Sequence, residues 1–421
     1  MNSARGFDLS PTLAREKQRH VDGASSRPVQ WYFDNLLPEE ALRTVIAKDA
    51  GVSAEDAFGL LAYFGAESAG SLVLAHAGKL SPAQSGVRAL PLHELNARIL
   101  NLASASLTKD APKRMSLAGA QHKLLVILDG DALFEPLSAT PSTHILKPNH
   151  QGGAYPASVM NEYFTMRLAK AVGLDVPDVH CRYVPQPVYL VDRFDRILPA
   201  GGESKLAQHA DEVQRRHVID TCQLLNKART FKYSAAHIGT LTQALQFCRA
   251  KAAARLQLYR WLIFNVLVGN GNNHLKNISF LVDSNGINLA PAYDMLCTAV
   301  YDTRAMAGDN AKWPNTELAF ALGEVSTFGA LRREHLIGAA AALGLAQRTA
   351  IRELDAMLAN LPREADLLIA AIAQRQGDTL AHCPDPDSAR KHFAGEMRML
   401  RAARLMVFAQ MCRQLASVST P

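Results

Sequence analysis

The chain has 421 residues, which is long enough for one large two-lobed unit or for two or three domains. Its 48% apolar and 20% charged residues are the composition of an ordinary soluble globular protein. The net charge of +6 permits an acidic partner or nucleic acid but does not require either.

The N-terminus lacks the apolar segment of a signal peptide. The longest run of small and apolar residues, 336–346, is shorter than the roughly 20 residues that span a bilayer. The sequence therefore predicts a cytoplasmic protein with no membrane partner. The cysteines form no CxxC pair and no metal-ligand spacing, which predicts reduced thiols; they are Cys181, Cys222, Cys248, Cys297, Cys383 and Cys412.

The first third of the chain is expected to be helical after a polar, loosely ordered entry of about thirty residues. Pro38 to Glu40 begin one helix, with Leu42, Val45 and Ile46 at helical spacing. Ser53 and Asp56 resemble a capping box that begins a second helix, and a short helix is expected at 92–103.

Strand patterns follow from residue 123. Strands are predicted at 123–128, 132–136, 144–148, 179–184 and 188–192. A helix is expected between the third and fourth of these, at 158–173, and Gly173 ends it. From about residue 217 the chain is predicted to be mostly helical, apart from one hairpin at 278–293. The expected fold class is α+β, with a helical N-terminal piece, a small strand-rich lobe and a large helical lobe.

One segment carries a pattern typical of phosphoryl transfer from ATP. A polar loop at 269–277 is followed by a tight hairpin and then by Asp294. Such chemistry needs a loop residue that orients the attacking hydroxyl, a metal ligand five positions later, and a carboxylate that holds the metal against the phosphates. Asn277 and Asp294 supply these ligands, and Asn272 occupies the orienting position. The alternative, an Asn- and Gly-rich surface loop before an ordinary hairpin, is favoured when the segment is considered alone.

Upstream residues weaken that alternative because they occur in the order that a kinase needs. Lys147 lies on a predicted strand and can reach phosphates, and Glu162 begins the next helix and can pair with it. Before them, the small residues of 116–121 form a candidate phosphate-covering loop, made of Ser116, Leu117, Ala118, Gly119, Ala120 and Gln121. Neither a P-loop motif nor a dinucleotide-binding motif is present.

These segments together resemble the HipA family of serine/threonine kinase toxins of bacterial toxin–antitoxin pairs. The resemblance covers nearly the whole chain, and its matching stretches are 31–39, 116–123, 143–148, 193–196, 269–277 and 291–294. It implies a protein-kinase-like, two-lobed fold. It also suggests boundaries: an N-terminal segment at 1–108 truncated at its start, a kinase N-lobe at 109–196, and a helical C-lobe at 197–421.

The resemblance implies ATP and Mg²⁺ as cofactors and gives each site residue a role. Lys147 is expected to contact the nucleotide phosphates, and Asn277 and Asp294 to hold Mg²⁺. His274 and Lys276 are expected to shape the catalytic loop. Adenine is expected to be read by the hinge strand, with Asp192, Arg193, Phe194 and, nearby, Asp195. Ser116 corresponds to a serine that family members autophosphorylate to switch the kinase off, since a phosphate there cannot share the site with a triphosphate.

Three departures from the family pattern matter. Asn272 replaces an aspartate, and an amide cannot accept the proton of the attacking hydroxyl, so transfer should be severely slowed while Mg-ATP binding survives. The other site positions favour an inactivated kinase over a natural pseudokinase. His122 stands where the family commonly has an acidic residue. The chain begins inside the usual N-terminal domain, which suggests that a separate small HipS-like protein supplies the missing strands.

By the same resemblance, the target is a translation protein such as an aminoacyl-tRNA synthetase, and phosphorylation would arrest growth. The expected partner is a HipB-like DNA-binding antitoxin, through which any contact with DNA would be indirect. Two alternatives stay open. One is a non-catalytic, nucleotide-binding protein that acts as a co-repressor, and the other is a small-molecule phosphotransferase.

Three further features concern the helical part of the chain and the stretch before it. His217, Asp220 and Gln223 recur at helical spacing, near the substrate cleft by resemblance, with core or capping roles equally open. The basic residues Lys227, Arg229 and Lys232 are interpreted as a solvated face. In the C-terminal helices, the apolar residues are interpreted as lobe core, with an antitoxin-docking surface as the alternative; they include Met397, Leu400, Ala403, Met406 and Phe408.

Overall fold

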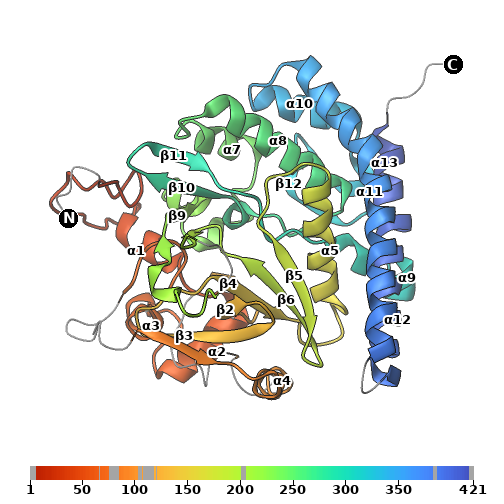
Figure 1. Cartoon of the computed structure of the whole chain (residues 1–421). Coiled ribbons are helices and arrows are strands. Elements are labelled where there is room, and N and C mark those ends of the chain that lie inside the picture. The colour runs from red at the N-terminus through yellow and green to blue at the C-terminus, as the bar shows by residue number, and fades with distance from the viewer. Residues whose placement is uncertain are drawn as a thin grey trace. The chain divides into compact units, whose positions relative to one another are not determined.

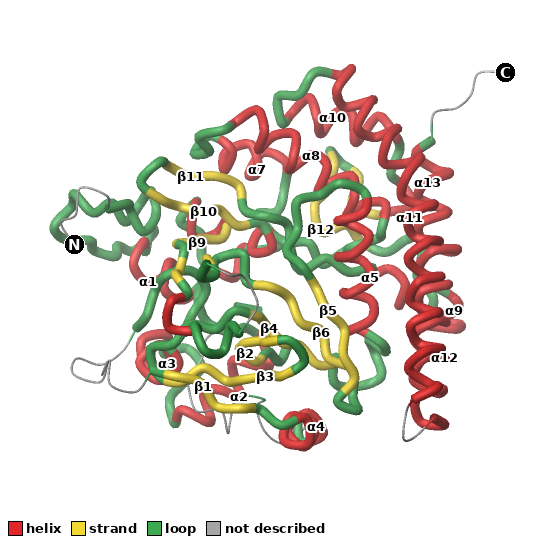
Figure 2. The backbone as a smooth tube through the Cα atoms, viewed as in Figure 1, coloured by secondary structure: helices red, strands yellow, loops and turns green. Residues whose placement is uncertain are grey.

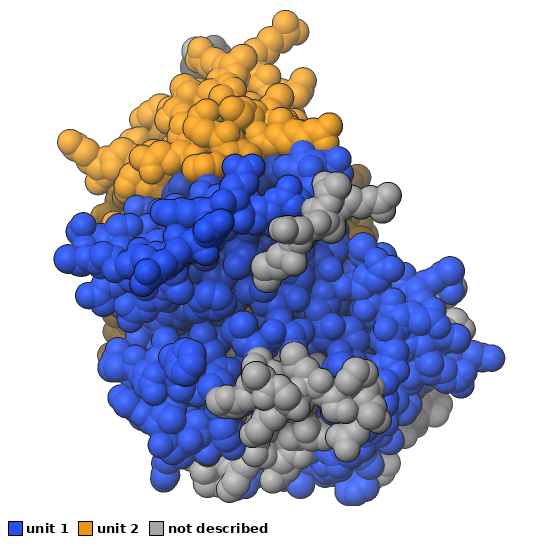
Figure 3. All heavy atoms as spheres, turned by 90° about the vertical axis from the view of Figure 1, so that its left-hand side faces the viewer, with its two compact units in different colours: residues 1–151, 177–232, 278–290 blue, residues 152–176, 233–277, 291–421 orange. Residues whose placement is uncertain are grey.

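The computed structural model describes residues 6–65, 67–74, 85–102, 107, 118–119, 121–200, 205–382 and 386–416. The chain divides into two compact units, each assembled from several stretches of sequence (Figure 3). Unit 1 contains residues 1–151, 177–232 and 278–290, and unit 2 contains residues 152–176, 233–277 and 291–421. The sequence boundaries at 108 and 196 remain a prediction.

The largest element of unit 1 is a six-stranded antiparallel sheet in the order β1-β3-β2-β4-β6-β5 (Figures 1 and 2). Leucines of neighbouring strands pack with Leu95 and Ile99 of α4 (Leu92–Leu100) into one core. The strands are β1 (Gly86–Ala89), β2 (Leu124–Asp129), β3 (Ala132–Leu137), β4 (His144–Pro148), β5 (Val179–Tyr183) and β6 (Pro187–Asp192). All five strands predicted between residues 123 and 192 are present.

Among the described residues, three short helices precede this sheet: α1 (Pro28–Asp34), α2 (Glu40–Ala50) and α3 (Ala57–Phe64). Gly51 ends α2 with a left-handed φ of 67°. The cap of α3 is Asp56, whose carboxylate accepts the Gly59 N–H, rather than the expected box begun by Ser53. The entry before α1 has no regular secondary structure, yet Ser10 and Leu13 are buried, so residues 6–13 are packed and not loosely ordered.

A second sheet of unit 1, in the order β11-β10-β9, corrects the prediction for residues 217–223. β9 (His217–Asp220) is a strand that pairs with β10 (Ser279–Asp283), and β11 (Gly286–Leu289) completes the sheet. The short α6 (Thr221–Leu224) begins directly after β9 with a reciprocal capping box between Asp220 and Gln223. The capping interpretation of this pair is therefore confirmed, and their helical spacing is not. A further short pair joins β7 (Arg196–Ile197) to β8 (Gln214–Arg215).

Unit 2 is mainly helical. Its most buried helices are α5 (Ser158–Ala171) and α8 (Lys251–Leu267), and α11 packs side by side with α12 (Figure 1). The other helices are α7 (Ile238–Leu245), α9 (Arg304–Ala307), α10 (Arg333–Ala342), α11 (Gln347–His382), α12 (Pro386–Ala402) and α13 (Ala409–Leu415). A hairpin of β12 (Glu317–Leu322) and β13 (Val325–Thr327) was not expected.

Two other expectations can be checked in the described residues. Leu400, Ala403 and Phe408 are fully buried, which confirms the core interpretation for these three residues, whereas Met397 and Met406 are half-buried. The cysteines that the structure describes are all free thiols, and Cys383 lies outside the described residues. None of the described helices combines the length and apolar character needed to cross a membrane.

Candidate active site

The polar loop after α8 is a tightly hydrogen-bonded segment of unit 2. Gly269 begins it with a left-handed φ of 65°, and a Cβ there would lie 2.5 Å from the Val407 side chain. The Asn270 side chain then donates to Asn265 Oδ1 at 2.7 Å and accepts the Asn272 N–H at 3.0 Å. Gly271 N–H donates to Thr298 Oγ1 at 2.7 Å. The backbone around Asn272 is therefore fixed by side chains of the surrounding unit.

Asn277 is bound to the backbone of the same loop. Its Nδ2 donates to the Asn272 carbonyl at 3.1 Å, and its backbone N–H donates to the His274 carbonyl at 2.9 Å. Because the amide nitrogen is used in this way, the amide oxygen is the atom left to face a cation. A hydrogen bond therefore joins Asn272, the predicted orienting residue, to Asn277, the predicted metal ligand.

The side chain of Asn272 has a partner that the sequence did not indicate. The Tyr233 hydroxyl donates to Asn272 Oδ1. The Tyr233 ring also meets the His274 ring edge to face, with centroids 5.0 Å apart. His274 is buried, and its role in shaping the loop stays a prediction. Lys276 is also buried, and its carbonyl accepts the Tyr293 hydroxyl at 2.7 Å.

Asp294 follows Tyr293 with a left-handed φ of 58°, an uncommon conformation for a non-glycine residue and one often found at functional sites. The chain just beyond it is fastened to α5. The Asn161 side chain donates to the Cys297 carbonyl at 2.9 Å and accepts the Cys297 N–H at 2.8 Å. Glu162, the next residue of α5, is buried. β11 ends at Leu289, so Asp294 lies beyond the hairpin, which was expected to extend to residue 293.

Lys147 lies on β4 in unit 1 and is also buried. Its ammonium group sits 5.7 Å from the centroid of the Tyr189 ring, and Tyr189 is its register partner on β6. Lys147 and Glu162 belong to different units, so their pairing stays a prediction.

The candidate phosphate-covering loop is only partly described, since Ser116, Leu117 and Ala120 lie outside the described residues. Gly119 has a φ of 116°, and a Cβ there would meet Lys123 Nζ at 2.6 Å. Ala118 accepts a hydrogen bond from Lys123 Nζ at 2.6 Å, and Gln121 Nε2 donates to the Pro148 carbonyl at 2.9 Å. Gln121 thus ties this loop to the residue that follows Lys147.

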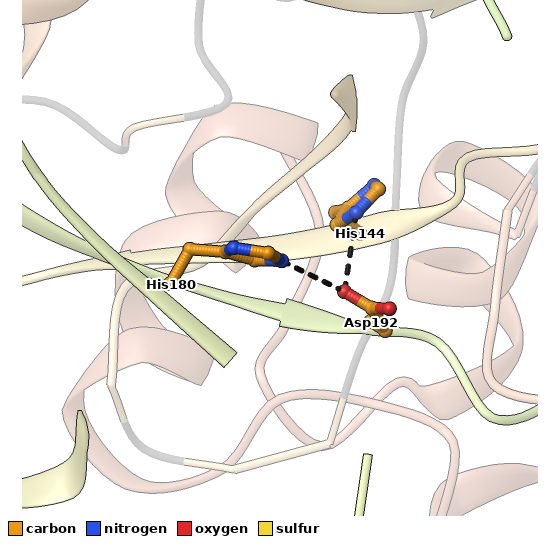
Figure 4. A group of neighbouring side chains, drawn as sticks. All are labelled: His144, His180 and Asp192. Carbon is orange, nitrogen blue, oxygen red and sulfur yellow. Dashed lines mark ion pairs between the residues drawn. The ribbon is translucent and has the colours of Figure 1, made fainter. Parts of the chain in front are cut away.

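Asp192, at the end of β6, is held by two histidines of neighbouring strands (Figure 4). Its Oδ1 lies 3.2 Å from His144 Nε2 and 3.4 Å from His180 Nε2. Burial raises the pKa of Asp192, but the two histidines outweigh burial and lower this pKa to about 2.

These three side chains also have the composition of a metal site. However, the Leu128 N–H donates to His144 Nδ1 at 3.3 Å, so the neutral His144 ring carries its proton on Nε2. That nitrogen then carries the proton and has no lone pair for a cation. We therefore interpret the cluster as a polar link between β4, β5 and β6.

The residues after Asp192 have partners inside unit 1. Arg193 donates to Asp195 at 2.9 and 2.7 Å and also contacts Glu67, and Arg196 contacts both Glu67 and Asp195. All four side chains are almost completely buried. Burial, followed by Arg193, lowers the pKa of Arg196 to about 10. The side chains of Arg193 and Asp195 thus have internal partners, and Phe194 is the half-buried member of the stretch.

Two of the three basic residues interpreted as a solvated face, Arg229 and Lys232, are instead paired with acidic residues of 34–40. Arg229 Nε lies 3.0 Å from Asp34. Lys232 Nζ lies 2.6 Å from Glu39 and 3.0 Å from Glu40, and it is buried. The solvated-face interpretation is therefore wrong for Arg229 and Lys232. Sequence reasoning also missed Glu67 and Tyr233, because neither lies in a motif and both are identified only by contacts distant in sequence.

Comparison with known proteins gives consistent matches over the chain. The model of the HipA-like C-terminal domain matches residues 115–365, and that of the HipA N-terminal domain matches residues 1–75. The serine/threonine-protein kinase toxin HipA of Shewanella oneidensis is 29% identical over 399 residues, covering 90% of this chain and 87% of that protein. Y4mE of Sinorhizobium fredii, a kinase by name, is 36% identical over 306 residues, or 69% of each chain.

A solved structure agrees over almost the same length. It comes from the complex of HipA, HipB and operator DNA of Shewanella oneidensis MR-1. The similarity has a TM-score of 0.71 and 25% identity, and covers 98% of this chain and 92% of the other. The expected kinase-like α+β fold is thereby confirmed.

Proposed function

Since this chain belongs to the HipA family, we propose that it is a serine/threonine protein kinase toxin that is impaired at Asn272. The observation that carries the proposal is the hydrogen-bonded pair of Asn272 and Asn277. The Asn277 amide nitrogen is bound to the Asn272 carbonyl at 3.1 Å, so its oxygen is left for Mg²⁺.

The other site residues have the roles that the family implies. Asp294 is the second Mg²⁺ ligand, and Lys147 holds the ATP phosphates. When bound, Mg²⁺ would supply positive charge that neutralises the charge developing on the phosphates during transfer. Gln121 holds the covering loop next to Lys147 by its hydrogen bond to Pro148. Adenine contacts come from the stretch 192–195; because Arg193 and Asp195 use their side chains internally, we assign these contacts to Phe194 and to backbone groups.

Asn272 decides how fast transfer can be. Its amide can hydrogen-bond a substrate hydroxyl but cannot take the proton, and a general base typically contributes about 100- to 10,000-fold to rate. In an active form, growth arrest would follow from phosphorylation of a translation protein such as an aminoacyl-tRNA synthetase. Autophosphorylation of Ser116 would act as the off-switch. Through a HipB-like antitoxin, the protein would reach operator DNA in the cytoplasm; a HipS-like partner remains a prediction.

The test is transfer of label from radioactive ATP by this chain and by its Asn272→Asp variant, with Ser116→Ala added to each. We expect only the Asn272→Asp form to label itself, and to lose that label when Ser116 is replaced. Mg-ATP binding, measured by calorimetry, should be similar in both forms. If neither form binds Mg-ATP, the proposed function is wrong.

A second candidate is a non-catalytic, nucleotide-loaded co-repressor, and the amide at position 272 is the observation that favours it. It predicts that both forms bind Mg-ATP while neither labels itself or added translation proteins. A small-molecule phosphotransferase would be recognised by label on free amino acids or sugars, with the protein itself unlabelled.

A further inference from the structure

The contact between Tyr233 and Asn272 has no role in the mechanism described so far. Tyr233 is 42% exposed, yet its hydroxyl and its ring both have defined partners in unit 2. The hydroxyl donates to Asn272 Oδ1, and the ring lies edge to face with His274. An exposed tyrosine that contacts two residues of one catalytic loop is unlike a side chain that only covers surface.

The chain immediately before Tyr233 is also anchored. Lys232 is buried and is held by Glu39 at 2.6 Å and Glu40 at 3.0 Å within unit 1. Glu39 in turn donates its backbone N–H to the Gly119 carbonyl of the candidate phosphate-covering loop at 3.2 Å. The residue before Tyr233 is therefore anchored within unit 1.

The hydrogen bond restricts how residue 272 can turn. With Oδ1 held by Tyr233, the other terminal atom of the side chain is directed away from the tyrosine. In this chain that atom is Nδ2, a donor that cannot accept a proton. In an Asn272→Asp variant it would be a carboxylate oxygen, placed to accept the proton of the attacking hydroxyl. The hydrogen bond from Tyr233 would also stabilise the ionised carboxylate.

We propose that Tyr233 is a positioning residue for phosphoryl transfer, which orients residue 272 toward the substrate hydroxyl. The inference rests on the proposed kinase function. In the step that it serves, the substrate hydroxyl loses its proton to the Asn272→Asp carboxylate while its oxygen bonds to the γ-phosphorus. The bond from that phosphorus to the β–γ bridging oxygen breaks, and ADP leaves with the electron pair.

The test compares Tyr233→Phe with the parent in the Asn272→Asp full-length chain. Phenylalanine keeps the ring against His274 and removes only the hydroxyl. We expect the rate of self-labelling at saturating Mg-ATP to fall roughly tenfold, with little change in the KM for ATP. The acidic limb of the rate profile should move up by about one pH unit, because the carboxylate loses a hydrogen bond to its charged form. Tyr155→Phe is the matched control, since Tyr155 is 43% exposed and packs on Tyr301.

Two results would overturn the proposal. One is a Tyr233→Phe form that labels itself as fast as its parent with an unchanged pH profile. The other is a slower rate with an unchanged acidic limb and a lower melting temperature, which indicates a purely structural role.

A readout that needs no transfer separates this proposal from the kinase function. The carboxyl carbon of the Asn272→Asp side chain is titrated by NMR with and without the Tyr233 hydroxyl. An upward shift of its pKa in Tyr233→Phe supports the positioning role even if no label is transferred. An unchanged pKa refutes it even if the enzyme is active.

Discussion

Two polar stretches of this protein are proposed parts of a kinase site, but they use their side chains differently. In the loop at 269–277, the side-chain amide nitrogens of Asn270 and Asn277 are held by hydrogen bonds. The amide oxygen of Asn277 is left to face the proposed ligand. In the stretch at 192–196, the charged groups are taken up by partners within unit 1: Arg193 and Arg196 by Glu67 and Asp195, and Asp192 by two histidines.

The comparison shows that a motif position does not by itself identify a ligand-binding side chain. What distinguishes the two stretches is whether each polar side chain retains an atom for the ligand after its internal hydrogen bonds are made. We therefore expect substitutions at 192–196 to change stability and substitutions at 269–277 to change binding and transfer.

The largest expected effect on stability is that of Arg193→Ala. This change leaves Glu67 and Asp195 buried with less positive charge, and breaking one side of a buried ion pair typically costs about 3–5 kcal/mol. The free energy of unfolding in urea should fall by that amount. Arg182→Ala is the control, because Arg182 binds the Gly130 and Asp131 carbonyls of an exposed turn. An equal loss of unfolding free energy in both variants would show that the buried cluster contributes no more to stability than Arg182 does.

Asn277→Ala tests the other side of the comparison. It removes the amide oxygen proposed to hold Mg²⁺, so we expect affinity for Mg-ATP to fall by about 10- to 100-fold, with about 1 kcal/mol lost from stability. Calorimetry with Mg-ATP and urea unfolding measure the two effects. Asn285→Ala, in the exposed turn between β10 and β11, is the control. A large loss of stability with unchanged affinity for Mg-ATP would show that Asn277 stabilises the fold and does not bind the metal.

Much of the fold was predictable where the signals are local. The strands at 123–128, 132–136 and 144–148 and the helix stopped by Gly173 depend on neighbouring residues, and the structure confirms them. The strand at 217–220 was missed because it forms by pairing with residues 279–282. Pairing with a distant strand gives no clear local pattern in a four-residue strand, and the polar residues here also fit a helical spacing.

The candidate site divides in the same way. Asn272, Asn277 and Asp294 were identified by their spacing along the chain, which depends on one loop and one hairpin. Tyr233 reaches Asn272 across a separation of 39 positions, and Glu67 reaches Arg196 across 129. Contacts of that separation depend on the packing of each unit, which no local pattern encodes.

Asp192 gives a smaller, pH-dependent effect. Its folded pKa of about 2 lies below its ordinary value of 3.8, so its ionisation stabilises the fold above about pH 4. This contribution of about 2 kcal/mol is lost as pH falls from 4 to 2. Urea unfolding of the chain and of Asp192→Asn should differ by that amount at pH 7 and converge toward pH 2. A difference that is independent of pH would mean that the histidines do not interact with the charge.

The smallest expected effect is at His217, which joins the entry segment to β9. Its ring lies 2.9 Å from the Leu9 carbonyl through Nε2, and stacks on Phe7 with centroids 5.1 Å apart. His217→Gln should cost about 1 kcal/mol through lost packing and hydrogen bonding, and should expose residues 6–13 to limited proteolysis.

Burial also lowers the pKa of His217, so below about pH 6.5 the unfolded chain binds the additional proton and stability falls. The natural chain should therefore lose more stability between pH 7 and pH 5 than His217→Gln does, as measured by urea unfolding. His209→Gln is the control, because His209 is exposed and paired only with Glu212 among its described contacts. Equal pH dependence in all three chains would show that His217 does not titrate on unfolding, and that the entry segment is held by packing alone.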